Sequence, residues 1–312
     1  MKSHLKGIIF IIFLFVLLCA GECTAVKINS IGELSPDHLQ IVTTTSVDQT
    51  GLMGELEKKF IAQYHLSGVD WMVKSSNVAI EEGKNCSVDV VMIPDKDLED
   101  MFIDNGYGLN RRYFGSNYYI IVGPKKDPAS IKGKTAVQAF RAIAEYASIH
   151  TDVSFISRGD NSGTHAKEKT IWEKAGLAYT DMNNSHLSPW YISAREDIGS
   201  VLALAREKQA YALVNAAVYA TSPDNTSLAR LVDEGDQDLI NIYSVMMVNP
   251  DKCPSVNAKA AKDWINFLIS NETQDFLKEF GNDTYGDAFF FPAKGDEYAL
   301  NTTKEEIESP VA

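Results

Sequence analysis

Hydrophobic and polar positions follow first a strand pattern and then a helix pattern near the start of the chain. Residues 39–43 form a short run rich in β-branched side chains, which predicts a strand. Beyond it, Leu52, Leu56, Phe60 and Tyr64 recur at the spacing of one helix face, with charged residues between them. The pattern therefore predicts a strand, a hydroxyl-rich turn and an amphipathic helix.

The same succession continues through most of the chain. Further strands are predicted at 69–73, 88–93, 118–122, 153–156, 212–214 and 240–248. Further helices are predicted at 98–105, 136–148, 162–175, 200–208, 258–269 and 273–280. Strands that alternate with helices in this way are typical of an α/β protein with largely parallel sheets.

The length of 312 residues is large for one hydrophobic core and favours two lobes. The long strands predicted at 118–122 and 240–248 bracket the middle of the chain, and we interpret them as the two crossings between lobes. The predicted division is lobe I at 36–122 and 243–300, lobe II at 123–242, and a charged, flexible tail at 301–312.

Residues 1–25 are typical of an export signal. Lys2 and Lys6 precede or flank an apolar run at 7–20, which has the length of a signal h-region. An uncleaved anchor is the alternative, although a spanning helix usually needs about 20 apolar residues. Lipid attachment at Cys23 is weakly supported, because no small residue precedes it. We therefore expect a protein outside the cytoplasm, secreted or tethered to the outer face of the membrane.

The formal net charge of −13 excludes some partners. A chain this acidic is not expected to bind nucleic acid. Its overall charge cannot attract an anion either, so any anion site must be built locally.

Two cysteines, Cys86 and Cys253, remain beyond the signal segment. Outside the cytoplasm they could form a disulfide, but two free buried thiols are an equally acceptable reading. No spacing of cysteine and histidine suggests zinc, and we expect no metal and no cofactor.

The first segment whose side chains could bind a ligand is the hydroxyl-rich turn at 43–46. A helix N-terminus leaves backbone N–H groups unpaired and carries a partial positive charge. Thr44, Thr45 and Ser46 would add hydroxyl donors there, so an anion could bind without a lysine. The alternative is that Thr45 or Ser46 only caps the helix.

The second segment is the glycine-rich turn at 157–165, again between a predicted strand and helix. Arg158 offers a fixed fork of donors that suits oxyanions, and Asp160 could hold this arginine or cap the helix. A surface salt bridge is the alternative for Arg158. The two turns fall in different predicted lobes, and ligands of open α/β sheets bind at the carboxyl ends of strands. Facing lobes would therefore bring both turns to one cleft.

Three strings resemble the tungstate-binding proteins of ABC importers. They are TTTSVDQTGLM, DNGYGLNRRYFGSNYYIIVGPKKDPASIKG and FISRGDNSGTHAKEKTIWEKAGL. The similarity extends over residues 40–220 and more loosely to residue 290. The resemblance implies an α/β, two-lobed type II periplasmic-binding-protein fold with a hinge and an inter-lobe cleft. It also implies that the cleft holds a small oxyanion for delivery to an ABC transporter permease.

Carried over by position, the resemblance implies Arg158 as the charged clamp and a set of donors from the two turns, namely Thr44, Thr45, Ser46, Gly163 and Thr164. We add four polar residues as candidate ligand-binding residues, namely Ser75, Ser76, Ser162 and Asn215. The chain departs from the family at 74–77, where Lys-Ser-Ser-Asn replaces Val-Gly-Thr-Gly, and at 197–199, where Asp-Ile-Gly replaces Gly-Met-Gly. Neutral residues at 214–218 replace a charged pair of the family.

Other functions remain open. The altered segments favour a divergent paralogue that binds molybdate, sulfate or phosphate, or that acts as a sensor. A hydrolase using Ser162 and His165 is a weaker alternative, because triad members normally come from separate segments and no Gly-X-Ser-X-Gly elbow is present. A surface adhesion protein is suggested by six Asn-X-Ser/Thr sites, at Asn85, Asn183, Asn225, Asn271, Asn282 and Asn301.

Overall fold

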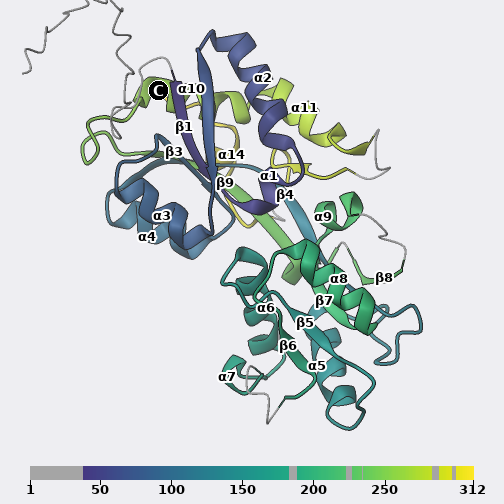
Figure 1. Ribbon diagram of the computed structural model, residues 1–312. Coiled ribbons are helices and arrows are strands. Elements are labelled where there is room, and N and C mark those ends of the chain that lie inside the picture. The colour runs from purple at the N-terminus through teal and green to yellow at the C-terminus, as the bar shows by residue number, and fades with distance from the viewer. Residues whose placement is uncertain (1–37, 183–187, 223–226, 234, 283–287, 297–299) are drawn as a thin grey trace, which may run out of the picture. The chain divides into compact units, whose positions relative to one another are not determined.

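The computed structural model describes residues 38–182, 188–222, 227–233, 235–282, 288–296 and 300–312 (Figure 1). These described residues all belong to one compact unit. The predicted signal segment at 1–25, and with it the question of anchoring, lies outside the described residues. Within the described ranges, no helix combines the length and the apolar character that crossing a bilayer requires.

The strands form a mixed sheet in the order β2-β1-β3-β9-β4-β7-β5-β6, and β8 and β10 also pair with β4. Their bounds are β1 His38–Thr43, β2 Gly68–Val73, β3 Val90–Ile93, β4 Gly108–Gly123, β5 Phe155–Ser157, β6 Tyr191–Ser193, β7 Tyr211–Asn215, β8 Ala229–Val232, β9 Ile240–Val248 and β10 Phe291–Pro292.

Parallel pairing is confined to the two ends of this sheet. β1 pairs in parallel with β2 and β3, and β5 with β6 and β7. β4 and β9 run antiparallel to each other and to their other neighbours. The expectation of largely parallel sheets was therefore wrong for the centre, because β4 carries the chain from one end of the sheet to the other and β9 brings it back.

The helices pack on the faces of the sheet (Figure 1). Their bounds are α1 Thr45–Asp48, α2 Leu52–Tyr64, α3 Ser76–Lys84, α4 Lys96–Asp104, α5 Ala136–Ala147, α6 Gly163–Lys174, α7 Tyr179–Met182, α8 Ile198–Lys208, α9 Ala216–Thr221, α10 Ala258–Leu268, α11 Asn271–Glu279 and α14 Lys304–Glu308, with a 3-10 turn at Gln237–Leu239. α3 was not predicted, because its few buried apolar residues form only a weak helical stripe.

Two aromatic centres anchor the hydrophobic core. Near one end of the sheet, the Phe60 ring of α2 lies 4.9 Å from that of Trp264 of α10. Near the other end, the Phe140 ring of α5 lies 5.2 Å from that of Phe155 and 4.2 Å from that of Trp172. These centres fall in predicted lobes I and II respectively, while the lobe boundaries themselves stay a prediction.

A buried polar cluster lies where β4 and β9 pass between the two aromatic centres. Asn117 of β4 and Asn241 of β9 are cross-strand partners. Oδ1 of Asn117 accepts hydrogen bonds from Nδ2 of Asn215 (2.9 Å), Nδ2 of Asn241 (3.1 Å) and the hydroxyl of Tyr243 (3.2 Å). Burial raises the pKa of Tyr243 to about 12, so the phenol stays protonated and donates. The cluster joins β4, β7 and β9 at one point.

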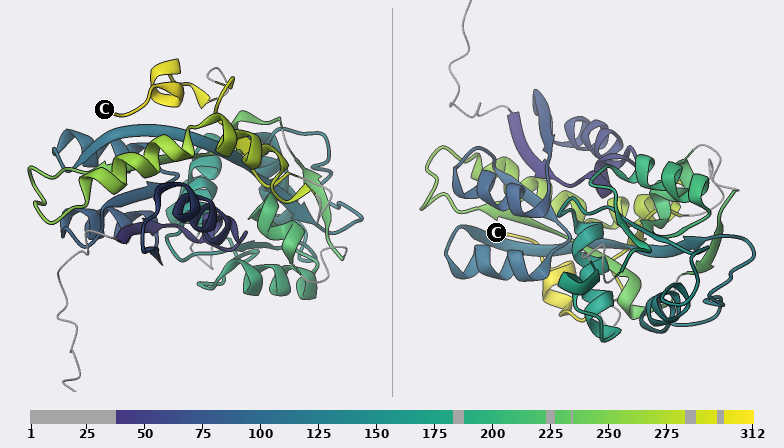
Figure 2. Two further views of the ribbon diagram at one scale, coloured as in Figure 1. Left: turned by 90° about the horizontal axis from the view of Figure 1, so that it is seen from above. Right: turned by 60° about the horizontal axis from the view of Figure 1, so that its bottom comes forward.

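The C-terminal segment 301–312 packs against the sheet, so the predicted flexible tail was wrong. Figure 2 shows α14, in yellow, lying along the long strand β4. Arg111 of β4 forms an ion pair with Glu306 (2.9 Å), and the Asn266 side chain exchanges two hydrogen bonds with the backbone of Val311. The many charged residues concealed a pair of apolar positions, Ile307 and Val311, that are both buried.

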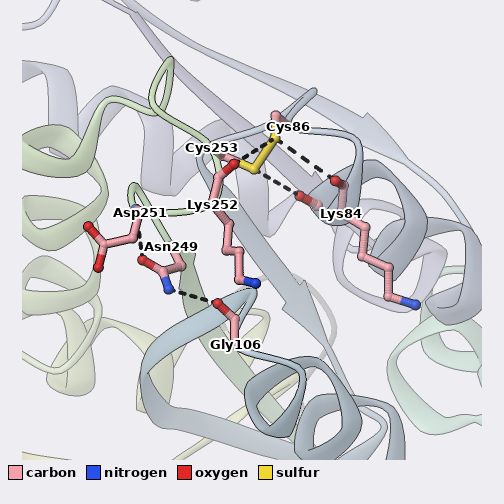
Figure 3. The surroundings of a disulfide bond; sticks show 8 residues. Lys84, Cys86, Gly106, Asn249, Asp251, Lys252 and Cys253 are labelled. Carbon is pink, nitrogen blue, oxygen red and sulfur yellow. Dashed lines mark hydrogen bonds between the residues drawn. A yellow bond between two sulfur atoms is a disulfide. The ribbon is translucent and has the colours of Figure 1, made fainter.

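Cys86 and Cys253 form a disulfide, with their Cα atoms 5.3 Å apart. Figure 3 shows that the bond joins the segment after α3 to the loop that follows β9. The sequence left open whether these cysteines are paired, and the structure shows that they are. The bond links two residues that lie 167 positions apart in the sequence.

We predict that replacing both cysteines with alanine lowers the free energy of unfolding by about 2–4 kcal/mol, chiefly because the unfolded chain regains the freedom that the cross-link removes. Urea unfolding of the oxidised protein and of the Cys86→Ala/Cys253→Ala variant measures the difference. Wild-type protein unfolded with excess reductant is the control and should approach the variant. Equal midpoints for oxidised wild type and variant would contradict the prediction.

Candidate functional site

One small cavity is lined by residues from segments far apart in the sequence. The lining residues are Thr44, Thr45, Ser46, Lys74, Ser75, Ser76, Pro94, Tyr119, Arg158, Ser162, Gly163 and Thr164. The cavity volume is about 30 Å³, whereas one water needs roughly 10–15 Å³ by a comparable measure. The space therefore suits a group of only a few heavy atoms. Every predicted site residue except Asn215 lines it.

Three of the lining segments are turns that lead from the carboxyl end of a strand into a helix. They connect β1 to α1, β2 to α3, and β5 to α6. The turns after β1 and β2 are tied together, because the N–H of Lys74 donates to the carbonyl of Thr43 (2.9 Å). β1 and β2 are parallel neighbours, so their turns lie at the same edge of the sheet. β5 lies beyond the antiparallel centre of the sheet and runs opposite to β1, so its turn reaches the cavity from the other side.

The hydroxyls of the first turn are not used to cap α1. Thr44 occupies the N-cap position, and its side chain makes no capping hydrogen bond. Its Oγ1 lies 3.2 Å from Oγ of Ser46, so the two hydroxyls cluster beside the cavity. The capping alternative for this turn is therefore not supported. Since α1 has only four residues, individual N–H and O–H donors matter here more than a helix dipole.

The second turn repeats this arrangement. Ser75 is the N-cap of α3 and makes no side-chain capping bond, and Ser76 begins the helix. Oγ of Ser76 is buried and has no hydrogen-bond partner within the described part of the chain. Lys74 also lines the cavity, although the sequence did not indicate it as a site residue. A serine N-cap before Val78 and Ala79 was the available signal for the helix.

The third turn depends on a glycine. Gly159 has φ +61°, and a Cβ atom at this position would overlap Oγ of Ser193. Its N–H donates to Oγ of Ser157 (3.1 Å), which winds the chain tightly after β5. The residue immediately before it, Arg158, is thereby directed at the cavity. Only glycine fits both the backbone conformation and the space at 159.

Arg158 is largely buried, with 8% of its surface exposed. One of its terminal nitrogens donates to Oδ2 of Asp160, while its Nε is buried without a hydrogen-bond partner among the described residues. Oδ1 of Asp160 accepts from the N–H of Ser162 (3.1 Å). Burial opposes ionisation of Asp160, but these bonds and the charge of Arg158 hold its pKa below the usual value. Asp160 thus fixes both the arginine and the start of α6.

The side chain of His165 is also held by hydrogen bonds near the start of α6. Nδ1 of His165 accepts the N–H of Asn161 (2.9 Å), so Nε2 carries the proton and lies 2.9 Å from the hydroxyl of Tyr179. Burial lowers the pKa of His165, which keeps the ring neutral at pH 7. Oγ of Ser162 accepts the backbone N–H of His165 (3.4 Å). The ring therefore stabilises the turn through both of its nitrogens and does not activate Ser162.

Tyr119 of β4 completes the wall and was not proposed from the sequence. Its side chain is 2% exposed, and burial raises the pKa of its hydroxyl. The phenol therefore stays protonated and can donate a hydrogen bond. It lies 3.7 Å from the point where a Cβ on Gly163 would stand, so the glycine leaves the helix start open to the cavity.

The charges around the cavity are one-sided. Lys74 and Arg158 line it, and none of the described lining residues carries a carboxylate. The other lining groups are mainly hydroxyls and first-turn N–H groups, which are unpaired within a helix. The cavity can therefore bind an acceptor-rich, negatively charged group.

Comparison with known proteins identifies the family of this chain. The family model described as a PBP superfamily domain matches residues 32–272. The tungstate-binding protein TupA of Peptoclostridium acidaminophilum is 31% identical over 93% of this chain and 98% of its own length. The chain belongs to the PBP, or periplasmic-binding-protein, superfamily, in the family of these tungstate-binding proteins.

Solved structures support the same assignment. The tungstate-binding protein TupA from Desulfovibrio alaskensis G20 is 32% identical, with a TM-score of 0.71, over 82% of this chain and 98% of its own. The tungstate ABC transporter protein from Geobacter sulfurreducens is 34% identical, with a TM-score of 0.67, over 79% of this chain and all of its own. The mixed α/β fold described above is thus the PBP fold.

Asn215 occupies a different place in this PBP from the one expected. Its Nδ2 donates to Asn117, and its Oδ1 accepts the N–H groups of Ala217 (3.1 Å) and Val218 (3.4 Å) at the start of α9. The side chain is buried and does not line the cavity. Asn215 therefore holds the strands behind the site together, and a direct ligand contact stays an untested prediction.

We predict that Gly159→Ala lowers the free energy of unfolding by about 2–4 kcal/mol, because a left-handed alanine is strained and its methyl would collide with Ser193. Gly176→Ala is the matched control, since Gly176 also has positive φ but faces open space. It should cost only about 1–2 kcal/mol. Urea unfolding of both variants measures this, and equal losses would contradict the role of Ser193.

Proposed function

We propose that this protein binds a small tetrahedral oxyanion, with tungstate the first candidate, and presents it to an ABC importer outside the cytoplasm. The single observation that carries the proposal is the cavity lined by hydrogen-bond donors and two cations without a carboxylate. Its small volume favours an inorganic anion over an organic solute.

The chemistry of the anion matches this set of donors. Tungstate at neutral pH is a dianion with no proton, so it accepts hydrogen bonds and donates none. Hydrogenphosphate carries a proton that needs an acceptor, and a carboxylate would be the natural partner. Because no described lining residue supplies a carboxylate, the site favours fully deprotonated ions such as tungstate, molybdate and sulfate over phosphate.

The proposed contacts come from both predicted lobes. Thr44, Thr45, Ser46, Ser75 and Ser76 would donate from lobe I. Arg158, Ser162, Gly163 and Thr164 would donate from lobe II. An ion held by one set would recruit the other, and the lobes would close about β4 and β9 by a hinge motion. Closure would then distinguish the loaded protein for its permease.

Transport follows from the relatives and not from the cavity alone. Of the relatives compared above, two are named tungstate-binding proteins and one is described as a tungstate ABC transporter. An importer of this kind needs its binding protein on the outer side of the membrane, which agrees with the export signal predicted at 1–25. We infer a binding protein and not an enzyme, since the His165 ring is engaged by Asn161 and Tyr179.

A second candidate is a binding protein or sensor for another anion. The altered segment 74–77 favours it, because Lys74, Ser75 and Ser76 all line the cavity. Isothermal titration calorimetry with tungstate, molybdate, sulfate and phosphate distinguishes the candidates. We expect the tightest binding for tungstate, whereas a preference for one of the others would favour the second candidate. The oxyanion proposal fails if none of the four binds at micromolar concentration.

We predict that Arg158→Ala weakens tungstate binding roughly tenfold to hundredfold, because loss of a charge-assisted hydrogen bond in a sheltered site costs about 1.5–3 kcal/mol. Arg158→Lys should fall between wild type and alanine, since it keeps the charge but loses the fork of donors. Arg141→Ala, on α5 and away from the lining residues, is the control. An unchanged dissociation constant for Arg158→Ala would remove this arginine from the site.

A further inference from the structure

Lys74 has an unusual position among the lysines of the described chain. It follows β2 directly and lines the cavity, and its backbone is fixed by the bond from its N–H to Thr43. Its side chain belongs to an exposed residue and so lies at the mouth of the cavity. The other lining cation, Arg158, comes from the turn after β5. The two cations therefore enter from different turns.

Lys74 also has no carboxylate partner within the described ranges. Many lysines of this acidic chain are paired, for example Lys58 with Glu55 (2.8 Å), and Lys96 with Asp100 (2.7 Å). No ion pair involves Lys74 within 4.0 Å in that part of the chain. A lysine left unpaired beside a cavity, in a protein of net charge −13, has its full charge available to a bound anion.

The other charges near the cavity do not supply a second unpaired cation. Arg158 is paired with Asp160, so this pair is formally neutral. The next carboxylate along the chain is Asp95, which follows the lining residue Pro94 and accepts the N–H of Leu98 (3.2 Å) at the start of α4. Lys74 is thus the lining cation whose charge no paired carboxylate offsets.

We propose that Lys74 determines charge selectivity at this site, favouring dianions over monoanions of the same shape. This inference rests on the proposed function and deepens it. The Coulomb energy between a cation and an anion is proportional to the charge of the anion, so removing Lys74 costs a dianion twice the energy that it costs a monoanion. Because energies are logarithms of affinities, the fold-change for the dianion is the square of that for the monoanion.

Tungstate and perrhenate provide the matched probes, because both are tetrahedral oxyanions of a heavy metal and they differ by one unit of charge. Calorimetry with sodium tungstate and sodium perrhenate is done on wild type, Lys74→Gln and Lys132→Gln. Lys132 is exposed and does not line the cavity, so its replacement controls for the change in overall charge. We expect Lys74→Gln to weaken tungstate about tenfold and perrhenate about threefold, and Lys132→Gln to change neither.

The salt dependence of tungstate binding supplies a second measurement that needs no perrhenate affinity. An exposed charge is screened by salt, so the affinity of wild type for tungstate should fall with sodium chloride more steeply than that of Lys74→Gln. Lys132→Gln should keep the wild-type slope.

The outcomes separate the inference from the function on which it rests. If wild type binds neither anion, the proposed function fails. If wild type binds tungstate but Lys74→Gln keeps its affinity and its salt slope, the role of Lys74 is overturned while oxyanion binding stands. Equal losses for tungstate and perrhenate would also overturn it, because the lysine would then act through something other than its charge.

Discussion

The pairing of β4 with β9 is the constraint on which the rest of the structure depends. These strands pair from Gly108 and Val248 to Tyr118 and Ile240, so they connect the two aromatic centres of the core. The pairing is polar near its Tyr118 end, where Asn117 accepts three hydrogen bonds. A shift of register by one residue would leave these buried groups without partners, which is costly. The polar cluster therefore fixes how the turns on either side meet.

The cavity that these turns form lowers the stability of the fold. The Nε of Arg158 and the Oγ of Ser76 are buried without partners in the described chain, and each such group costs about 1–3 kcal/mol. The fold tolerates this cost because Arg158 is held in place by the tight turn at Gly159, by Asp160 and by the start of α6. Donors that are already in place need little reordering when an acceptor arrives, which favours tight binding of a small ion.

The sequence predicted most of the fold, because the hydrophobic periods of the buried elements are strong: β9 coincides with the predicted 240–248, and α5 nearly so with 136–148. It failed where burial comes from distant partners. β4 begins ten residues before the predicted 118–122, since its polar first half is covered by α14. Lys74 lines the cavity only because distant segments meet there in the folded chain. Asn215 instead forms a hydrogen bond within the polar cluster. Conformational preference alone cannot reveal such contacts.

The disulfide has a consequence for a protein exposed to proteases. Because Cys86 and Cys253 are bonded, every peptide bond between them lies inside a covalent ring. A single cut anywhere in this ring would leave both pieces attached, and the hydrogen bonds of β4 with β9 would keep them in register. A nicked chain would therefore remain one particle with both halves of its cavity, and only a second cut or a reductant would release a fragment.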